Sequence, residues 1–321
     1  MCKYYPAIPQ ILTLVIISLF TSAAANAQPY AYVSNLSGNN VSVVNSATNA
    51  MVALISVPAG PTGLAATPDA KSVYVASQST NSVSVISTSS HSIVNTISVG
   101  SVPVAVAVNP SGTLVYVVDQ GSNQVSVIDT AQKAVTAKIA VGSRPTAIAF
   151  SPDGTHAFVT NLWSSTVSVI STSTHSVVST FATQSGPSAI AVSPNGEYIY
   201  VGNAYSNSVT VHTSPSGALV KSISGLAYPN SVAVTPSGSH IYVANGNGGS
   251  VSVINASTNT LMATIATGSL PTSVAISPDG KHAYVTNEFG FTLSVIDTGT
   301  NTVTTTIPRV GVYPVRVATV L

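Results

Sequence analysis

The chain has few charged residues, and what it lacks limits the kind of protein it can be. Only 5% of its 321 residues are charged, against about 25% in an average soluble domain. Its one cysteine is Cys2, so the rest of the chain has no thiol for disulfide or thiolate chemistry. After the N-terminus, apolar residues alternate with Ser, Thr and Asn instead of forming long runs, which indicates β-strands. We therefore expect an all-β protein with a surface rich in hydroxyl and amide groups.

The first 27 residues have the pattern of a secretory signal peptide. Lys3 supplies a thin positive region, and residues 11–20 form an apolar core about half as long as a membrane span. The sequence "ANA" at 25–27 places small residues at the −3 and −1 positions of a cleavage site. We expect cleavage before Gln28, no membrane span in the mature protein, and a secreted, periplasmic or cell-surface location. An uncleaved N-terminal anchor is the alternative.

The charges of the mature chain balance, which limits its partners. Without Lys3, eight basic and eight acidic residues remain. Extended binding to nucleic acid needs many Lys and Arg on one face, so it is not expected. Neither a phosphate-binding loop nor a metal-ligand spacing is present in the sequence, and we expect no cofactor and no metal.

Internal repetition is the strongest signal in the sequence. An aromatic residue followed by Val recurs every 42 residues, at Tyr32, Tyr74, Tyr116, Phe158, Tyr200, Tyr242 and Tyr284. Each unit has four short strands, A to D; in the fourth unit we expect them at 146–150, 156–160, 165–170 and 176–183. Four strands in about 42 residues, repeated seven times, are typical of a seven-bladed β-propeller. Residues 28–321 are thus predicted to form a single propeller domain.

The ends of the repeat predict how the ring closes. The mature chain starts at a strand B, "YAYVSN", and ends with a lone strand A at 314–320. Pairing the C-terminal strand with the N-terminal strands completes one blade and removes two exposed edges. Small residues follow each strand-A proline, as inner strands that converge on an axis require. Arg316 breaks this rule, because the other six units have Gly, Ala or Ser at its position.

The repeated motifs resemble one known family. "AYVTN" (283–287), "VSVID" (125–129) and "SPDG" (151–154 and 277–280) resemble the YVTN β-propeller repeat family, over the whole mature chain. The resemblance implies a secreted, periplasmic or surface-layer protein, mostly of a kind without an assigned activity. Some seven-bladed propellers with related repeats are lactonases, lyases or redox-enzyme subunits, and the fold alone does not choose among these activities.

One stretch of this repeat could be taken for a catalytic cluster. "SPDGKHAYVTN" (277–287) holds Asp279, Lys281 and His282 within four residues. Other units have "NPSG", "SPNG" or "TPSG" in the same place, and a turn tolerates the exchange of Asp for Ser or Asn where catalysis does not. We therefore predict a type I turn. Three units have a histidine after this turn, His156, His240 and His282, and these are expected too far apart to share a metal.

The rare arginines and several large aromatic residues fall in the D–A and B–C loops, which share the opposite face. The candidate ligand-binding residues are Arg144, Arg309, Arg316, Asp119, Glu288, Trp163, Tyr205, Tyr228 and Tyr313, with Phe289 and Phe291 on the same face. The planar fork of arginine suits a carboxylate or phosphate, although a rim that is simply solvated is the alternative. Because this face has no His or Lys for acid–base work, we assign no catalytic residue from sequence.

These observations favour one function and leave others open. The leading hypothesis is a secreted, non-catalytic propeller that acts as a scaffold and binds a protein or a small anionic ligand through this face. One alternative is a lactonase-like hydrolase or a lyase acting on a small anionic substrate at the channel mouth. Another is a surface-layer or adhesion component whose outer strands pair between molecules. Binding of single-stranded nucleic acid fits the aromatic residues but not the neutral charge.

Overall fold

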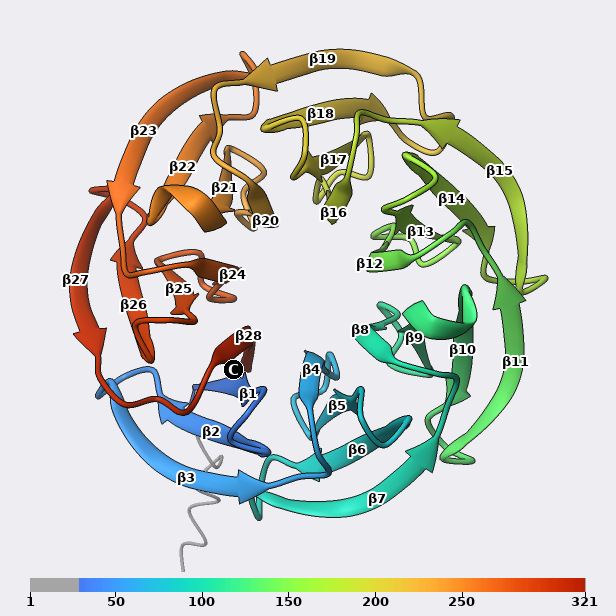
Figure 1. The fold of residues 1–321 in the computed structure, drawn as a ribbon, viewed down its shortest axis with the longest axis vertical. Coiled ribbons are helices and arrows are strands. Elements are labelled where there is room, and N and C mark those ends of the chain that lie inside the picture. Colours follow the sequence, from blue (N-terminus) through green and yellow to red (C-terminus); the bar gives the residue numbers. More distant parts are fainter. Residues whose placement is uncertain (1–28, 321) are drawn as a thin grey trace, which may run out of the picture.

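A computed structural model describes residues 29–320 of the chain. Seven sheets of four antiparallel strands stand around a central axis like the blades of a propeller (Figure 1). In each blade, strand A is nearest the axis and strand D is outermost. The predicted all-β, seven-bladed propeller is thus confirmed. The predicted signal peptide at 1–27 lies outside the described residues.

Each blade consists of four strands that follow one another from the axis outward. Blade one contains β28 (Pro314–Val320), β1 (Tyr30–Asn35), β2 (Asn40–Asn45) and β3 (Ala50–Ser56). Blade two contains β4 (Pro61–Ala66), β5 (Ser72–Ser77), β6 (Ser82–Ser87) and β7 (Ser92–Ser98). Blade three contains β8 (Pro103–Val108), β9 (Leu114–Asp119), β10 (Gln124–Asp129) and β11 (Ala134–Ala140). Blade four contains β12 (Pro145–Phe150), β13 (His156–Asn161), β14 (Thr166–Ser171) and β15 (Ser176–Ala182).

The remaining blades follow the same order. Blade five contains β16 (Pro187–Val192), β17 (Tyr198–Asn203), β18 (Ser208–Thr213) and β19 (Leu219–Ser224). Blade six contains β20 (Pro229–Val234), β21 (His240–Asn245), β22 (Ser250–Asn255) and β23 (Thr260–Ala266). Blade seven contains β24 (Pro271–Ile276), β25 (His282–Asn287), β26 (Thr292–Asp297) and β27 (Thr302–Ile307). Two 3-10 turns, η1 (Gln120–Ser122) and η2 (Gly246–Gly248), lie in B–C loops. Among residues 29–320, no helix is long and apolar enough to cross a membrane.

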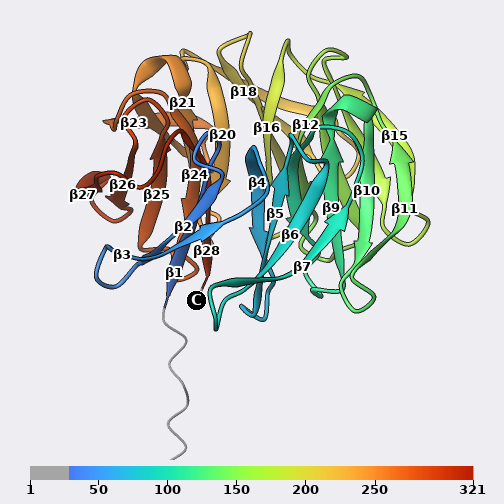
Figure 2. The same ribbon diagram turned by 60° about the horizontal axis from the view of Figure 1, so that its bottom comes forward.

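The ring closes through blade one, as the sequence predicts. β28 pairs antiparallel with β1, so that Tyr32 faces Ala318 and Ser34 faces Arg316 across the ladder. Figure 2 shows the two strands side by side, close to the C-terminus of the chain. The first and last strands of the propeller therefore belong to one sheet.

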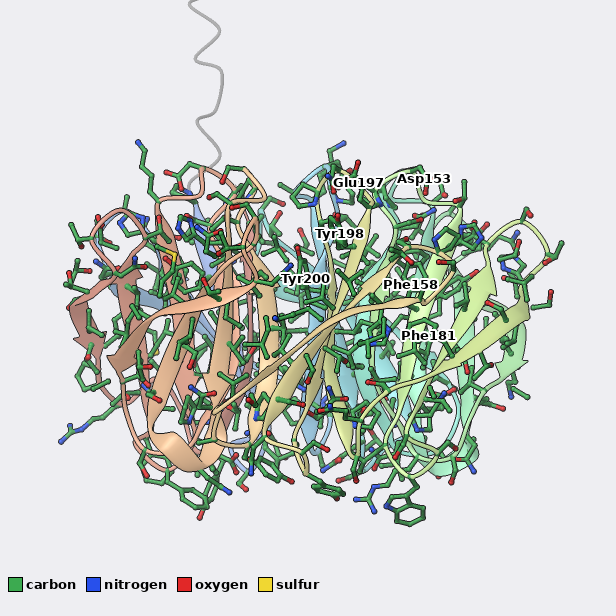
Figure 3. All side chains as sticks on the ribbon, turned by 90° about the horizontal axis from the view of Figure 1, so that it is seen from above. Asp153, Phe158, Phe181, Glu197, Tyr198 and Tyr200 are labelled. Atoms are coloured by element: carbon green, nitrogen blue, oxygen red, sulfur yellow. The ribbon has the colours of Figure 1, made fainter. Side chains whose placement is uncertain are left out.

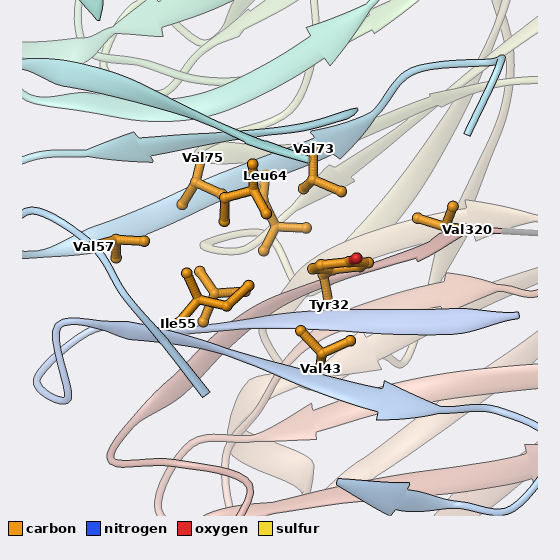
Figure 4. Close-up of a cluster of buried hydrophobic side chains, with 10 residues drawn as sticks. Tyr32, Val43, Ile55, Val57, Leu64, Val73, Val75 and Val320 are labelled. Atoms are coloured by element: carbon orange, nitrogen blue, oxygen red, sulfur yellow. The ribbon is translucent and has the colours of Figure 1, made fainter. Parts of the chain in front are cut away.

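Most of the apolar core lies between neighbouring blades. In one cluster, Tyr32 and Ile55 of blade one pack with Leu64, Val73 and Val75 of blade two (Figure 4). Equivalent clusters recur around the ring. The aromatic residue that marks each repeat is thus a core residue, which explains its fixed spacing. Burial of such a side chain contributes about 1.5–3 kcal/mol.

Polar contacts also join neighbouring blades at the axis. The second residue of most inner strands donates to the carbonyl of the proline that begins the next inner strand: Thr62 to Pro103 (2.9 Å), Thr146 to Pro187 (2.9 Å), Ser188 to Pro229 (2.6 Å), Asn230 to Pro271 (3.4 Å) and Thr272 to Pro314 (3.2 Å). Val104 of blade three has no donor, and there Gln120 Nε2 reaches the carbonyl of Pro145 instead (3.3 Å).

The "SPDG" stretch forms the predicted turn. The Gly280 N–H donates to the Ser277 carbonyl (2.8 Å), and the Asp279 carboxylate accepts from Ser277 Oγ (2.6 Å) and from the Lys281 N–H (3.0 Å). These hydrogen bonds, first of all the one from Ser277, hold the pKa of Asp279 below its ordinary value. The aspartate is therefore a turn-forming residue, and the catalytic interpretation of this stretch is not supported.

Candidate functional site

Most of the predicted site residues lie on one face of the ring, the face that carries the B–C and D–A loops, which we call the mouth face. Glu288 follows β25 in a B–C loop, Arg144 precedes β12 in a D–A loop, and Arg316 lies in the inner strand β28. The D–A loops are built alike: the residue before each inner-strand proline has a positive φ, at Gly60, Val102, Arg144, Gly186, Tyr228, Leu270 and Tyr313. Residues other than glycine adopt this conformation only when their surroundings hold them there.

A recurring asparagine supplies that support. Asn123 in the B–C loop of blade three accepts the Arg144 N–H through Oδ1 (2.8 Å), and Asn207 accepts the Tyr228 N–H in the same way (2.9 Å). Each contact joins the B–C loop of one blade to the D–A loop that leads into the next. The side chains of Arg144 and Tyr228 therefore start from a fixed backbone.

A cavity of ≈ 340 Å³ lies at the centre of the mouth face. It is lined by Leu36, Thr62, Gln78, Val104, Gln120, Thr146, Ser188, Asn230, Thr272, Glu288, Val315 and Arg316. A smaller hollow of ≈ 130 Å³ continues along the inner strands and shares Ser188, Asn230 and Arg316 with it. Hydroxyl and amide groups surround one acid and one base, so the cavity is polar and suits a ligand of the size of a single sugar.

Glu288 and Arg316 are the charged pair of this cavity. Burial raises the pKa of Glu288 above its ordinary value, and the nearby Arg316 opposes that rise. Burial likewise lowers the pKa of Arg316, and Glu288 opposes that fall. In the described part of the chain the only ion pair is Lys71 with Asp69 (3.6 Å), so the two groups influence each other without direct contact. Arg316 Nη1 donates to the Thr272 carbonyl (2.6 Å), which orients the guanidinium in the cavity.

Aromatic side chains surround the cavity as a partial rim. The Arg144 guanidinium lies over the ring of Trp163, 4.8 Å from its centre. Tyr205 packs against Tyr228 with ring centres 6.1 Å apart. Tyr313 packs edge-on against Phe289 (5.9 Å) and Phe291 (5.4 Å). The structure thus brings the predicted aromatic residues together in three clusters.

Two predicted residues lie elsewhere. Asp119 ends β9 and is 0% exposed; its carboxylate accepts from Ser126 Oγ (2.6 Å) inside the blade, and it does not line the cavity. Arg309 is exposed in the loop between β27 and β28, also away from the cavity. We leave both out of the proposed site. Sequence reasoning missed cavity residues such as Gln78 and Asn230. Gln78 carries one signal, because it shares the repeat position of Glu288, whereas Asn230 shares that of Thr272 and carries none.

Another cavity lies on the opposite face, between blades five and six. It has a volume of ≈ 570 Å³ and is lined by Asn195, Tyr198, Tyr200 and His240 among others. Figure 3 shows Tyr198 close to this end of the blades and Tyr200 deeper. No three His, Cys, Asp or Glu side chains in residues 29–320 are placed to hold a metal. This groove has no pair of opposite charges comparable to Glu288 and Arg316, so we regard the mouth cavity as the better candidate.

Comparison with family models identifies the class of the protein. Residues 22–135 and 128–264 match the model described as lactonase, seven-bladed β-propeller, and together they cover more than half of the chain. The chain belongs to this family. Residues 216–319 also match a YNCE-like β-propeller model. No curated protein matches the chain.

Solved structures share the fold. Hydrazine synthase of Kuenenia stuttgartiensis has a TM-score of 0.78 and 24% identity, covering 83% of this chain and 92% of that chain. A protein described as a putative 6-phosphogluconolactonase from Bacteroides uniformis has a TM-score of 0.78 and 20% identity, covering 91% and 100%. Another with that description, from Bacteroides fragilis, has a TM-score of 0.78 and 16% identity, covering 93% and 99%. Likeness at these identities shows the propeller fold.

Proposed function

We propose that this protein is a lactonase-like hydrolase that opens the lactone of a small sugar acid in the mouth cavity. The observation that carries the proposal is the position of Glu288, an acid with a raised pKa that faces a polar cavity beside Arg316. Membership of the lactonase propeller family supports the same reaction. Compared with the sequence hypotheses, this favours the hydrolase alternative over the non-catalytic scaffold.

The two charged groups supply what lactone hydrolysis requires. The Glu288 carboxylate takes a proton from a water molecule, and the resulting hydroxide adds to the lactone carbonyl carbon. The Arg316 guanidinium stabilises the oxyanion of the tetrahedral intermediate. The ring C–O bond then breaks, the leaving alkoxide receives the proton from Glu288, and the hydroxy acid is released. Water is consumed, and the enzyme returns to its starting state.

The remaining cavity residues favour a substrate with several hydroxyl groups. Thr62, Thr146 and Ser188 already donate their protons to proline carbonyls, so their oxygens are left to accept hydrogen bonds from a substrate. Gln78 and Asn230 add amide groups at the same level. A polyhydroxylated ring matches this lining better than an apolar acyl chain does.

The proposal is tested by acid release from a panel of sugar lactones, measured by pH-stat. Glu288→Gln is expected to lower kcat by about 10²–10⁴-fold, because a general base is lost. Glu197→Gln is the control, since Glu197 is an exposed acid on the opposite face. For the parent protein, the rate should rise with pH to a plateau, with an apparent pKa above the ordinary glutamate value of 4.5, because the base must be ionised. Unchanged hydrolysis in Glu288→Gln would rule out this mechanism.

A second function, binding without turnover, has one observation in its favour. The cavity lining contains neither His nor Lys, the residues that most often serve as acid or base partners to a carboxylate. In that case sugar acids would bind in the cavity, Arg316→Ala would weaken the binding, and no lactone of the panel would be hydrolysed above the spontaneous rate. Isothermal titration with the corresponding sugar acids separates this scaffold function from the hydrolase.

A further inference from the structure

The rim of the mouth face is aromatic on one side only. Trp163, Tyr205 and Phe289 occupy the same place in the B–C loops of blades four, five and seven. They are 66%, 54% and 58% exposed. Blades one, two and three have Ser37, Ser79 and Gly121 at this position, and blade six, between two aromatic blades, has Asn247. Because buried packing does not require large side chains at this position, their exposure on one arc of the rim indicates a contact surface.

The cation of this arc has no acid partner. The Arg144 guanidinium lies flat over Trp163 at 4.8 Å, and its buried Nε has no hydrogen-bond partner. No ion pair in the described part of the chain includes Arg144. The ring and the hydrogen-bonded backbone at Asn123 therefore orient a guanidinium whose terminal nitrogens form no hydrogen bond or ion pair within residues 29–320, and these suit a carboxylate.

The neighbouring aromatic pair is held in place as well. A Cβ at Gly186 would lie 2.5 Å from Cγ of Tyr205, and Gly186 has a φ of +71°. Only glycine therefore fits beneath the Tyr205 ring, whose other neighbour is Tyr228. The ring rests on the backbone and presents its exposed surface to solvent.

We propose that this arc, consisting of Arg144, Trp163, Tyr205 and Tyr228, binds an acidic oligosaccharide. The C–H faces of sugar rings stack on Trp163 and Tyr205, and a uronate carboxylate is bound by the Arg144 guanidinium. This proposal rests on the proposed function in one respect, that one end of the bound oligosaccharide reaches the mouth cavity. Binding at the arc does not depend on lactone hydrolysis. It deepens that function by extending the ligand from one sugar to a short chain.

The charge of the protein separates this ligand from nucleic acid. A strand with one phosphate per residue is bound by several cations in a row, whereas the arc has one arginine and the mature chain as predicted has eight basic against eight acidic residues. Uncharged polar groups around Arg144, including Ser143 and Ser164, instead match the hydroxyls of a carbohydrate. Peptides rich in aromatic residues are the other class that the experiment must separate.

Trp163 makes the test direct, because it is the only tryptophan in the chain. Trigalacturonate is titrated into the full chain while tryptophan fluorescence is recorded, with its fully methyl-esterified form as the uncharged match. We expect a saturable change in emission with trigalacturonate and at least about tenfold weaker binding of the ester. Arg144→Gln should weaken trigalacturonate binding by a similar factor, and Tyr205→Ala should weaken both ligands. Arg309→Gln, at an exposed arginine outside the arc, should have no effect.

Several results would overturn the proposal. One is an unchanged emission at millimolar trigalacturonate; another is equal binding of acid and ester, or an unchanged affinity in Arg144→Gln. A response to an oligothymidylate or an aromatic-rich peptide, without one to trigalacturonate, would assign the arc to another class of ligand. Circular dichroism of each variant shows whether it is folded. Glu288→Gln separates the two proposals, because it should lower kcat for lactone hydrolysis by about 10²–10⁴-fold and leave the Trp163 response intact.

Discussion

An asparagine at the end of strand B is hydrogen-bonded to a serine of strand C in several blades. Asn161 Nδ2 donates to Ser168 Oγ (3.0 Å), and Asn287 Nδ2 donates to Ser294 Oγ (2.9 Å). Blade three has Asp119 in this position, and its Oδ1, like that of Asn161, is buried without a partner. Burial raises the pKa of Asp119 above its ordinary value of 3.8, against the hydrogen bonds from Ser126 and Gln124. Asp119 is therefore a buried acid that weakens its own blade when it is ionised.

Asp119→Asn should stabilise the protein by roughly 1–2 kcal/mol at pH 7, because the amide restores the donor that other blades use. The sign follows from linkage. With a raised pKa, the folded state holds its proton to higher pH than the unfolded chain, so stability falls as pH rises above about 3.8. The gain of the variant should thus shrink in acid. Urea unfolding at pH 7 and in acid measures the difference in stability between the variant and the parent protein. Asn161→Asp is the reciprocal control and is expected to destabilise the protein.

Burial of the Asp119 side chain explains why it is wrongly predicted from sequence as a ligand-binding residue. From sequence, Asp119 is expected in a B–C loop, whereas it is the last residue of β9 and its side chain is buried. The sequence does hold a signal that this position is structural, because Asn161 and Asn287 stand at the same position of their repeats and carry no charge. For Glu288, one position later, the side chain faces the cavity. Adjacent positions on a strand end point to opposite sides, and spacing alone does not say which side is open.

At the scale of the element, strand B is joined to the C–D turn of the next blade. The Tyr32 hydroxyl hydrogen-bonds to His91 Nδ1 (2.9 Å), and the Tyr116 hydroxyl to His175 Nδ1 (2.8 Å). Tyr242 donates to Asn301 Oδ1 in the same way (2.6 Å). Each pair is 59 residues apart. The histidines of these turns thus have a structural role that only the packing of one blade on the next reveals.

His91 should make stability depend on pH. Burial lowers the pKa of His91 below 6.5, so the unfolded chain binds a proton that the folded state excludes. Its contribution is fully present above pH 6.5 and is lost as pH falls through the lower, folded pKa. His91→Asn copies the Asn301 turn and keeps an acceptor for Tyr32. We expect it to flatten the fall of the unfolding free energy below pH 6.5. A slope unchanged from that of the parent protein would contradict this assignment.

The whole molecule is a ring, and sequence patterns predict this scale best. Seven copies at one spacing set the number of blades, and the unpaired first and last strands indicate closure. The site is harder to predict, because it depends on the single departures from the repeat. Arg316 is visible as one, since six equivalents are small. The contribution of Asn230 to the cavity lining is not visible in the sequence, because polar residues are ordinary at the second position of the inner strands.

Removal of residues 314–321 should abolish cooperative unfolding. β1 would lose its partner on the axial side and keep β2, and the inner strands β4 and β24 would lose a neighbour on one side. An unpaired strand edge also promotes association. Gel filtration and thermal unfolding by circular dichroism report the outcome. A peptide of residues 312–321 added in trans should restore the transition, and an unaltered midpoint in the truncated protein would show that closure contributes little.

The shared sheet of β28 and β1 also sets an order of events in time. β1 is made first and its partner last, with almost the whole propeller between them. At roughly 5–20 residues per second of synthesis, tens of seconds pass before the two can meet. During that interval β1 is a free edge that a holding chaperone, or another nascent chain, can bind. The speed with which the last strand arrives therefore governs how much of this protein is lost to misassembly.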